Sequence, residues 1–234
     1  MKQINQFITE YIIKKKLDKP IDSEDHYDYF PETTDELIKV IRMLLDKGET
    51  NFNCIDTSKI TDMSELFYNK GNINIDVSKW NVSNVKDMNR MFYNCEDFNC
   101  DLSNWDVSKV ENMERMFHYC EKFNCDLSNW NVSKVKNMSY MFYRCENFDC
   151  DLSKWDVSNV EKIDHMFCEC RIFIGKGLDN WNINKKVVDM SNMFDGCRKF
   201  NCDLSKWNTK RVKDMRYIFY NCDSLKNKPN WYKA

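Results

Sequence analysis

The sequence contains little glycine and little proline: 5 Gly and 3 Pro occur among its 234 residues. Collagen-like chains need glycine at every third position, and flexible linkers are rich in glycine, serine or proline, so both classes are excluded. The sequence also lacks a Gly-rich phosphate loop, a nucleophile elbow and a paired-carboxylate motif. We therefore expect neither an enzyme nor a bound cofactor.

An excess of charge and a long hydrophobic run are also missing. The 35 Lys and Arg residues nearly balance 37 Asp and Glu, and a net charge of −2 gives no electrostatic footprint for nucleic acid. The apolar stretch from Leu37 to Leu45 is broken by charges and is far shorter than the ~20 residues that span a bilayer, so membrane insertion is not expected. No signal peptide is recognisable, which favours a cytoplasmic location over secretion or cell-surface display.

What the sequence does have is an internal repeat. Tryptophan occurs at positions 80, 105, 130, 155, 181, 207 and 231, so the intervals are 24 to 26 residues. The segment from Phe98 to Cys120 recurs with few changes from Phe123 to Cys145, and a degenerate copy precedes Trp80. Counting that copy, about seven repeats are present.

Each repeat is predicted to contain a short strand and a short helix. The spacing of Leu102, Trp105 and Val107 matches the strand signature of leucine-rich repeats. Ser108 and Glu111 form a capping box for a following helix. The apolar face of that helix repeats at steps of three and four residues and comprises Val110, Met113, Met116, Phe117 and Cys120.

The repeats predict an elongated, stacked architecture. A single repeat cannot bury its large apolar side chains alone, whereas stacked repeats bury them against one another. We therefore predict an α/β solenoid in residues 51–234, closed by a short C-terminal cap. Its structural core is predicted to contain the tryptophan column Trp80, Trp105, Trp130, Trp155, Trp181 and Trp207.

Residues 1–50 differ from the repeats and are predicted to form a helical N-terminal cap. A capping box from Thr33 to Glu36 opens one helix, and Gly48 is suited to end it. An earlier helix is predicted from the apolar face formed by Ile4, Phe7, Ile8, Tyr11 and Ile12. An alternative is that this region docks a partner protein.

The repeat pattern L-S-x-W-(D/N)-V-S-x-V-x-x-M-x-x-M-F-x-x-C resembles the repeat of BspA-like leucine-rich repeat surface proteins, over about residues 50–222. The resemblance implies a leucine-rich-repeat-like, right-handed superhelix that binds proteins, often in adhesion to host or neighbouring cells. This sequence departs from the surface-exposed members because it lacks a recognisable signal peptide and anchor.

Twelve cysteines occupy mostly regular positions in the repeats. One column closes the predicted helix, and a second column lies five residues later in four repeats. The resulting pairs are Cys95/Cys100, Cys120/Cys125, Cys145/Cys150 and Cys197/Cys202. Either the columns are buried free thiols, or each pair forms a disulfide across the turn between repeats. No metal site is expected, because the single cluster of His165, Cys168 and Cys170 lacks the second half of a zinc motif.

A partner-binding surface is predicted on the outward side of the strands, between the inward Trp and Val positions. This polar column comprises Asn81, Asp106, Asn131, Asp156, Asn182 and Asn208, flanked by Lys79, Lys154 and Lys206. Its short side chains could instead hydrogen-bond within neighbouring turns. A second candidate surface is the aromatic column Tyr68, Tyr93, His118, Tyr143 and Tyr220.

Together these features predict a non-enzymatic protein-binding repeat module, used in adhesion or in contact with a host or partner protein. One alternative is an intracellular scaffold, immunity or effector-type protein. A thiol or zinc enzyme is the third alternative. The expected partner is a protein, whose identity the sequence does not reveal.

Overall fold

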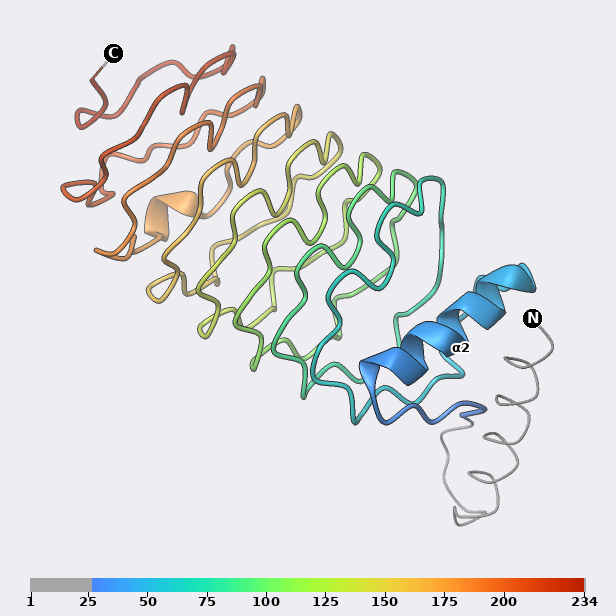
Figure 1. Ribbon diagram of the computed structural model, residues 1–234. Helices are drawn as coiled ribbons and strands as arrows, with labels where there is room; N and C mark the ends of the chain where they lie inside the picture. Colours follow the sequence, from blue (N-terminus) through green and yellow to red (C-terminus); the bar gives the residue numbers. More distant parts are fainter. Residues whose placement is uncertain (1–26, 234) are drawn as a thin grey trace.

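The computed structural model describes residues 27–233. These residues form a stack of coils, each about one repeat long, that extends from helix α2 (Thr34–Asp46) toward the C-terminus (Figure 1). The other regular element of the described residues is the 3-10 turn η1 (Leu178–Asn180). The described part of the chain contains no helix with the length and apolar character needed to span a bilayer.

Helix α2 begins and ends as the sequence predicts. The Thr33 hydroxyl accepts a hydrogen bond of 3.2 Å from the Glu36 N–H, as in the predicted capping box, and the Glu36 carboxylate accepts one of 2.8 Å from the N–H of Glu32, the residue before the N-cap. Gly48 has a φ of 76°, the left-handed conformation that commonly follows a helix. The buried face packs into the same apolar core as the first coil and comprises Leu37, Val40, Ile41, Met43 and Leu44. The other predicted helix, at Ile4–Ile12, lies outside the described residues.

Backbone hydrogen bonds join each coil to both of its neighbours. The N–H groups of Glu111 and Lys136 donate to the preceding coil, whereas from Met113 onward every second N–H group donates to a carbonyl of the following coil. The donors Met113, Arg115, Phe117 and Tyr119 pair with the carbonyls of Asn137, Ser139, Met141 and Tyr143. The intervening N–H groups close tight turns: Met116 donates to Met113, His118 to Arg115 and Cys120 to Phe117.

The predicted leucine-rich-repeat solenoid with a strand and a helix in each repeat is wrong. No strand occurs in residues 27–233, and contacts between coils are isolated parallel bridges such as Asn112 to Asn137. The segment around Met113 is not helical either, because an α-helix needs its N–H groups for carbonyls four residues earlier. Here half of them leave the segment for the next coil. The Ser108 N–H donates to Asp106 Oδ1 at 3.0 Å, so Ser108 belongs to a turn rather than a helix cap.

Apolar side chains nevertheless face the interior at the positions that the pattern indicates. The segment that was expected to be a helix has five side chains with 0% exposure: Val110, Met113, Met116, Phe117 and Cys120. A chain of three-residue turns and a helix share this spacing, so the burial follows while the backbone differs. Successive phenylalanine rings also stack along the core, with 5.7 Å between the ring centroids of Phe117 and Phe142.

Tryptophan side chains tie each coil to the preceding one. The six predicted core tryptophans are 4% exposed or less. Each indole N–H donates to a carbonyl of the preceding coil, as buried Trp side chains require. These pairs are Trp80 to Phe52, Trp105 to Val77, Trp130 to Leu102, Trp155 to Leu127, Trp181 to Leu152 and Trp207 to Leu178. Trp231 continues the series by donating to Leu204 and stacking on Trp207.

All twelve cysteines are free thiols in this structure. The first column serves as hydrogen-bond donors between coils, as when Cys120 Sγ donates to the Phe92 carbonyl at 3.0 Å. The second column accepts from backbone, as when the Leu102 N–H donates to Cys125 Sγ at 3.0 Å. A disulfide between Cys120 and Cys125 would remove the proton that Cys120 donates. The alternative of paired disulfides is therefore absent from the structure, which gives each column its own role.

Candidate binding surface

The polar column lies on the surface but is engaged within its own turns. Its six members, Asn81, Asp106, Asn131, Asp156, Asn182 and Asn208, are all exposed. In five of them, all except Asn182, Oδ1 accepts a hydrogen bond from the N–H group two residues later, the pattern of an Asx turn. The flanking Lys79, Lys154 and Lys206 are exposed as well, and Lys154 Nζ donates to Asn129 Oδ1 at 2.8 Å. This column therefore has a structural role whether or not it binds a partner.

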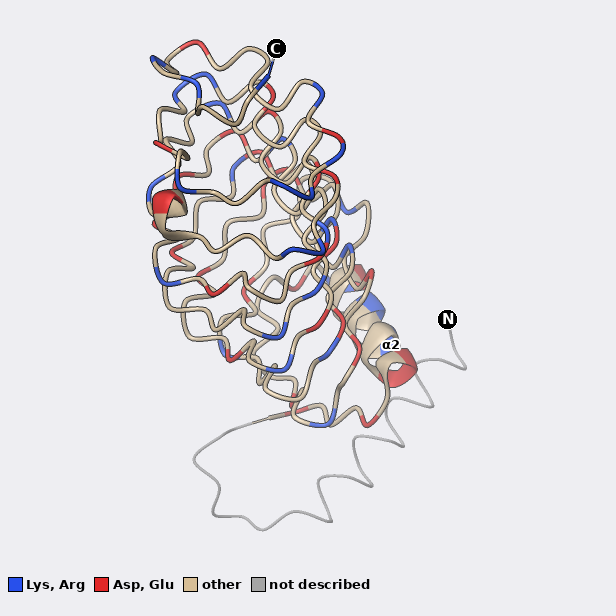
Figure 2. Cartoon of the chain, turned by 90° about the vertical axis from the view of Figure 1, so that its left-hand side faces the viewer, with Lys and Arg blue, Asp and Glu red and all other residues tan. Residues whose placement is uncertain are grey.

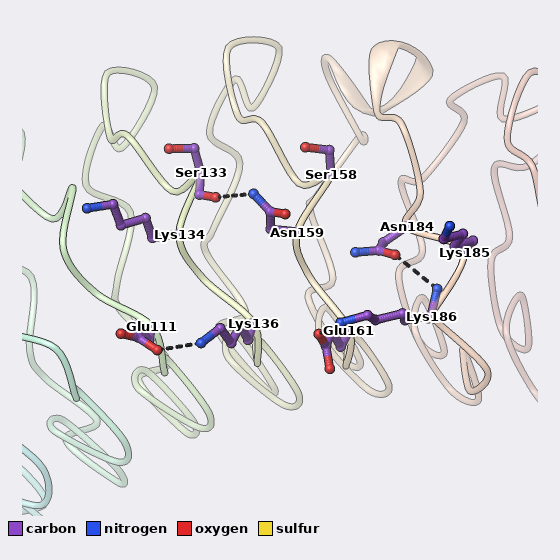
Figure 3. A pocket seen from close by; sticks show the side chains of 10 residues that line it. All are labelled: Glu111, Ser133, Lys134, Lys136, Ser158, Asn159, Glu161, Asn184, Lys185 and Lys186. Atoms are coloured by element: carbon purple, nitrogen blue, oxygen red, sulfur yellow. Dashed lines mark hydrogen bonds and ion pairs between the residues drawn. The ribbon is translucent and has the colours of Figure 1, made fainter.

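A polar groove of about 520 Å³ runs beside this column across neighbouring coils (Figure 3). Two of its four lysines are paired with glutamates: Lys136 Nζ lies 2.6 Å from Glu111 Oε2, and Lys186 Nζ lies 2.5 Å from Glu161 Oε1. The groove is lined by Ser, Asn, Lys and Glu side chains and by no aliphatic or aromatic side chain. Its geometry therefore provides little that would recognise a small molecule.

Another face of the stack carries a continuous row of aromatic rings. Tyr68 stacks on Tyr93 with 4.8 Å between centroids, and Tyr93 stacks on His118 at 4.6 Å. His118 in turn stacks on Tyr143 at 4.6 Å, with an angle of 10° between the rings. Tyr220, the last predicted member, is 57% exposed and lies in the final coil. The structure therefore brings four of the five predicted aromatic residues into one stack.

Two arginine–tyrosine pairs flank this row where it crosses the middle of the stack. The guanidinium carbon of Arg115 lies 4.6 Å from the ring centroid of Tyr140. The guanidinium carbon of Arg144 lies 5.1 Å from that of Tyr119. Arg115 and Tyr140 occupy equivalent positions of two adjacent coils, and so do Tyr119 and Arg144. The arginine belongs to the first coil in one pair and to the second coil in the other, so the four residues form a diagonal arrangement around His118. We call Arg115, Tyr119, Tyr140 and Arg144 the Arg–Tyr quartet.

All four quartet residues have a left-handed backbone. Their φ values are 55° at Arg115, 61° at Tyr119, 58° at Tyr140 and 58° at Arg144. A residue with a Cβ pays about 1–2 kcal/mol for this conformation, and asparagine and glycine tolerate it best. At the position of Tyr119 and Arg144, the other coils carry Asn69, Asn94, Glu169, Gly196 and Asn221, whereas at the position of Arg115 and Tyr140 they carry Glu65, Arg90, His165, Asn192 and Tyr217. The large side chains of Tyr119 and Arg144 therefore stand at a position where most other coils carry a smaller, less strained residue.

His118 is neutral at physiological pH. Burial lowers its pKa to about 3, and the positive charges of Arg115, Arg90 and Arg144 act in the same direction. The ring is 7% exposed, and its buried Nδ1 has no hydrogen-bond partner within the described residues. The same is true of the buried Nε of Arg144, whereas Arg90 is paired with Glu65 at 3.0 Å.

Carboxylates beside the quartet are held by neighbours. Glu114 forms an ion pair with Arg115 and accepts a hydrogen bond of 2.9 Å from Asn137. Asp164 is half-buried, and burial alone would raise its pKa, but hydrogen bonds from His165 and Ser139 outweigh that effect and lower it. Arg144, by contrast, has no ion pair among the described residues. The surface thus combines packed aromatic rings with one guanidinium that is stacked but not neutralised.

Sequence reasoning missed the quartet. It identified the aromatic column from equivalent repeat positions and singled out neither Tyr119 nor Arg144. A usable signal was present, because asparagine or glycine fills four of the seven positions in the column that includes Asn94 and Gly196. That composition indicates a left-handed position and hence turns in place of a helix.

No group of three or more His, Cys, Asp or Glu side chains within residues 27–233 is arranged to hold a metal ion. In the His165, Cys168 and Cys170 cluster, Cys170 Sγ donates to the Phe142 carbonyl at 2.9 Å. His165 stacks on Tyr140 and lies 3.3 Å from the Asp164 carboxylate. Cys170 and His165 therefore have separate structural contacts, and Cys168 is buried.

Comparison with known proteins identifies a family. The model of a family described as a Mycoplasma protein of unknown function, DUF285, matches residues 39–153 and 138–233. These matches cover most of the sequence, so the chain belongs to this family. No curated protein matches the chain.

One solved structure, titled "Crystal structure of TLR13-ssRNA13 complex", is weakly similar. Its TM-score is 0.22 with 10% sequence identity, and the alignment covers 82% of this chain and 48% of that chain. This chain thus spans about half the length of that protein. A similarity at this level supports no conclusion about fold or function.

Proposed function

We propose that the protein is a non-enzymatic binding protein, and that a partner protein contacts the Arg–Tyr quartet together with His118 and Tyr143. The observation that carries the proposal is the left-handed backbone at Tyr119 and Arg144, a position at which four of the five other coils carry asparagine or glycine. Local strain that smaller residues would relieve supports a further purpose for these two large side chains.

The composition of this surface supports protein recognition. Tyrosine and arginine are enriched among residues that dominate binding energies at protein interfaces. Ring stacking and the two cation–π contacts hold these side chains in place before a partner arrives, so little side-chain entropy is lost on binding. Arg144 adds a positive charge that is available to an acidic or carbonyl-rich partner.

The test compares two surfaces of the same fold. Quantitative affinity purification from extract of the native source would use the wild-type chain, the variant Y119N/R144N and the variant D106R/N131R/D156R. Asparagine occupies the equivalent positions in other coils, so Y119N/R144N retains the backbone conformation. We expect proteins bound by the wild type to be lost with Y119N/R144N and kept with the triple variant. The opposite result would favour the polar column, and retention by both variants would contradict both surfaces.

The biological setting is a separate proposal. The BspA-like resemblance supports adhesion or contact with a host, whereas the absence of a recognisable signal peptide supports an intracellular binding protein, whose twelve cysteines would stay reduced. Alkylation of native-source protein under denaturing, non-reducing conditions, followed by intact mass measurement, separates them. Twelve modified cysteines would support the intracellular setting. About four modified cysteines would indicate closed i, i+5 pairs and an oxidising compartment.

The cysteines also bear on the enzymatic alternative. Burial raises the pKa of Cys168 to about 12 and that of Cys95 to about 12, so neither is a thiolate at neutral pH. A thiol enzyme needs an accessible, ionised cysteine. These shifts support the proposal that the protein binds without catalysing a reaction.

A further inference from the structure

The last coil of the stack presents a row of backbone N–H groups for which no described residue supplies a hydrogen-bond acceptor. In the preceding coil, four N–H groups donate to this coil: Met190 to Asp214, Asn192 to Arg216, Phe194 to Ile218 and Gly196 to Tyr220. The equivalent N–H groups of the last coil are those of Met215, Tyr217, Phe219 and Asn221. None of these four has a hydrogen-bond partner within residues 27–233. We call them the C-terminal edge.

The surroundings of this edge form a groove of about 1060 Å³. Tyr217 and Tyr220, which line it, are 59% and 57% exposed. The indole of Trp231 covers Trp207 and contacts Phe219, so the tryptophan column is closed at this end. The row of donors is therefore the part of the last coil that is left open.

This end of the molecule is strongly basic. Residues 210–233 contain seven Lys and Arg against two Asp, a net charge of +5, whereas the whole chain has a net charge of −2. The charged residues can be followed in Figure 2. Lys210, Lys213 and Arg216 line the groove, and of these Arg216 is paired with Asp214. A ligand that enters the groove is favoured if it is acidic.

The opposite end of the stack is closed in a different way. Within the stack, a carbonyl such as that of Asp87 accepts a hydrogen bond from the N–H of the preceding coil, here that of Met63. In the first coil the equivalent carbonyl, that of Asp62, instead accepts a hydrogen bond of 2.8 Å from the hydroxyl of Thr34. Helix α2 thus occupies the place that a preceding coil would take. A second copy of the chain cannot pair its first coil with the C-terminal edge while α2 is in place.

Pairing of two C-terminal edges is also unfavourable. Both edges would offer N–H groups to each other, and both carry the same excess of positive charge. The occupant that satisfies the edge must instead supply carbonyl groups at every second residue and acidic side chains. We propose that the C-terminal edge binds an extended acidic segment of a partner protein by backbone pairing.

The test uses a peptide from the chain itself as the probe. Residues 187–196, VVDMSNMFDG, contain two Asp and no Lys or Arg. Within the fold, the carbonyls of Ser191, Met193 and Asp195 already accept N–H groups from the preceding coil. We expect the fluorescein-labelled peptide to bind the full chain saturably in an anisotropy titration. The peptide with Asp189→Lys and Asp195→Lys should bind at least about tenfold more weakly.

Matched protein variants locate the site. K213E/R216S introduces residues found at equivalent positions of other coils, Glu111 and Ser191, and should weaken binding about tenfold. K134E/K154S makes the same change in net charge on internal coils and should leave binding within about twofold of wild type. Equal thermal unfolding by circular dichroism would show that both variants fold.

Hydrogen exchange separates backbone pairing from general charge attraction. The amides of Met215, Tyr217, Phe219 and Asn221 should exchange rapidly in the free chain and become protected when the peptide is bound. No saturable binding, no protection of these amides, or equal weakening by both variants would each overturn the proposal. So would a dimer of the chain alone that K213E/R216S dissociates, since the occupant would then be a second copy.

Discussion

The indole Nε1 of Trp130 donates a hydrogen bond of 3.0 Å to the carbonyl of Leu102, which lies in the preceding coil. The same ring stacks on Trp105 with 6.5 Å between centroids. One side chain thus satisfies a buried backbone carbonyl and fills the space between two coils. The tryptophan column therefore carries both the polar and the apolar part of the contact between repeats.

Replacing this ring should destabilise the fold strongly. Trp130 is 2% exposed, and we expect Trp130→Ala to reduce the free energy of unfolding by about 3–5 kcal/mol, since it creates a cavity and leaves the Leu102 carbonyl unpaired. Urea denaturation measures the effect. Asn129→Ala, at the exposed neighbouring position, is the control and should change stability by less than about 0.5 kcal/mol. A loss below about 1 kcal/mol for Trp130→Ala would show that the packing is wrong.

His118 should make stability depend on pH. Its pKa is about 3 in the folded protein against an ordinary value of 6.5, so between these values the unfolded chain binds a proton that the folded chain does not. The stability that His118 contributes is therefore lost as pH falls from about 6.5 toward 3. Between pH 7 and pH 5 the loss should be about 1–2 kcal/mol.

His118→Tyr isolates this effect. Tyrosine occupies the equivalent positions 93 and 143, so the stack is kept while the titrating imidazole is removed. Urea unfolding of both proteins at pH 7 and pH 5 gives the difference, and other titrating groups cancel in the comparison. An identical pH dependence for wild type and variant would contradict a buried, neutral imidazole.

The thiols should be unreactive in the folded protein. Burial raises the pKa of Cys125 to about 12 and that of Cys120 well above its ordinary value, so both stay protonated at pH 8. Because the thiolate is the reactive form, a thiol reagent should modify the folded, reduced chain slowly at this pH. All twelve cysteines should react after denaturation. Rapid modification of the folded chain at Cys120 or Cys125 would show that these positions are open to solvent.

Strain at the quartet can be measured apart from binding. In Y119N/R144N, two left-handed residues become asparagine, which relieves about 1 kcal/mol, while the lost cation–π contact costs about 0.5–1 kcal/mol. We expect the free energy of unfolding to change by less than about 1 kcal/mol, as measured by urea denaturation. A large destabilisation would mean that Tyr119 and Arg144 serve the fold, and it would remove the main support for a binding role.

The sequence predicted which residues are buried better than it predicted the backbone. Val110, Met113 and Met116 lie in the core as expected, because their spacing of three residues suits any backbone that returns to one face at that interval. The pattern does not distinguish a helix from successive tight turns. The choice between them depends on the N–H groups that donate to the next coil. These long-range hydrogen bonds cannot be recognised from the sequence of a single repeat.

The candidate surface was predicted only in part. The polar column at Asn131 and Asp156 is exposed, as predicted. Its Asx turns were not predicted in a strand, because they need the turn geometry that the backbone adopts here. The stack through Tyr93 and His118 follows from the repeat length alone. The quartet required knowledge of left-handed φ values, which large side chains such as Tyr119 do not ordinarily indicate.

The hydrogen bonds between coils have a consequence for how such chains change in length. Each coil is tied to its two neighbours through the same donors and acceptors, so contacts between sequence-distant coils are not needed. Duplication of the 25-residue unit that ends at Trp130 or at Trp155 would insert one more coil with all its bonds supplied. Unequal recombination between near-identical repeats can therefore extend or shorten the protein without any compensating mutation elsewhere.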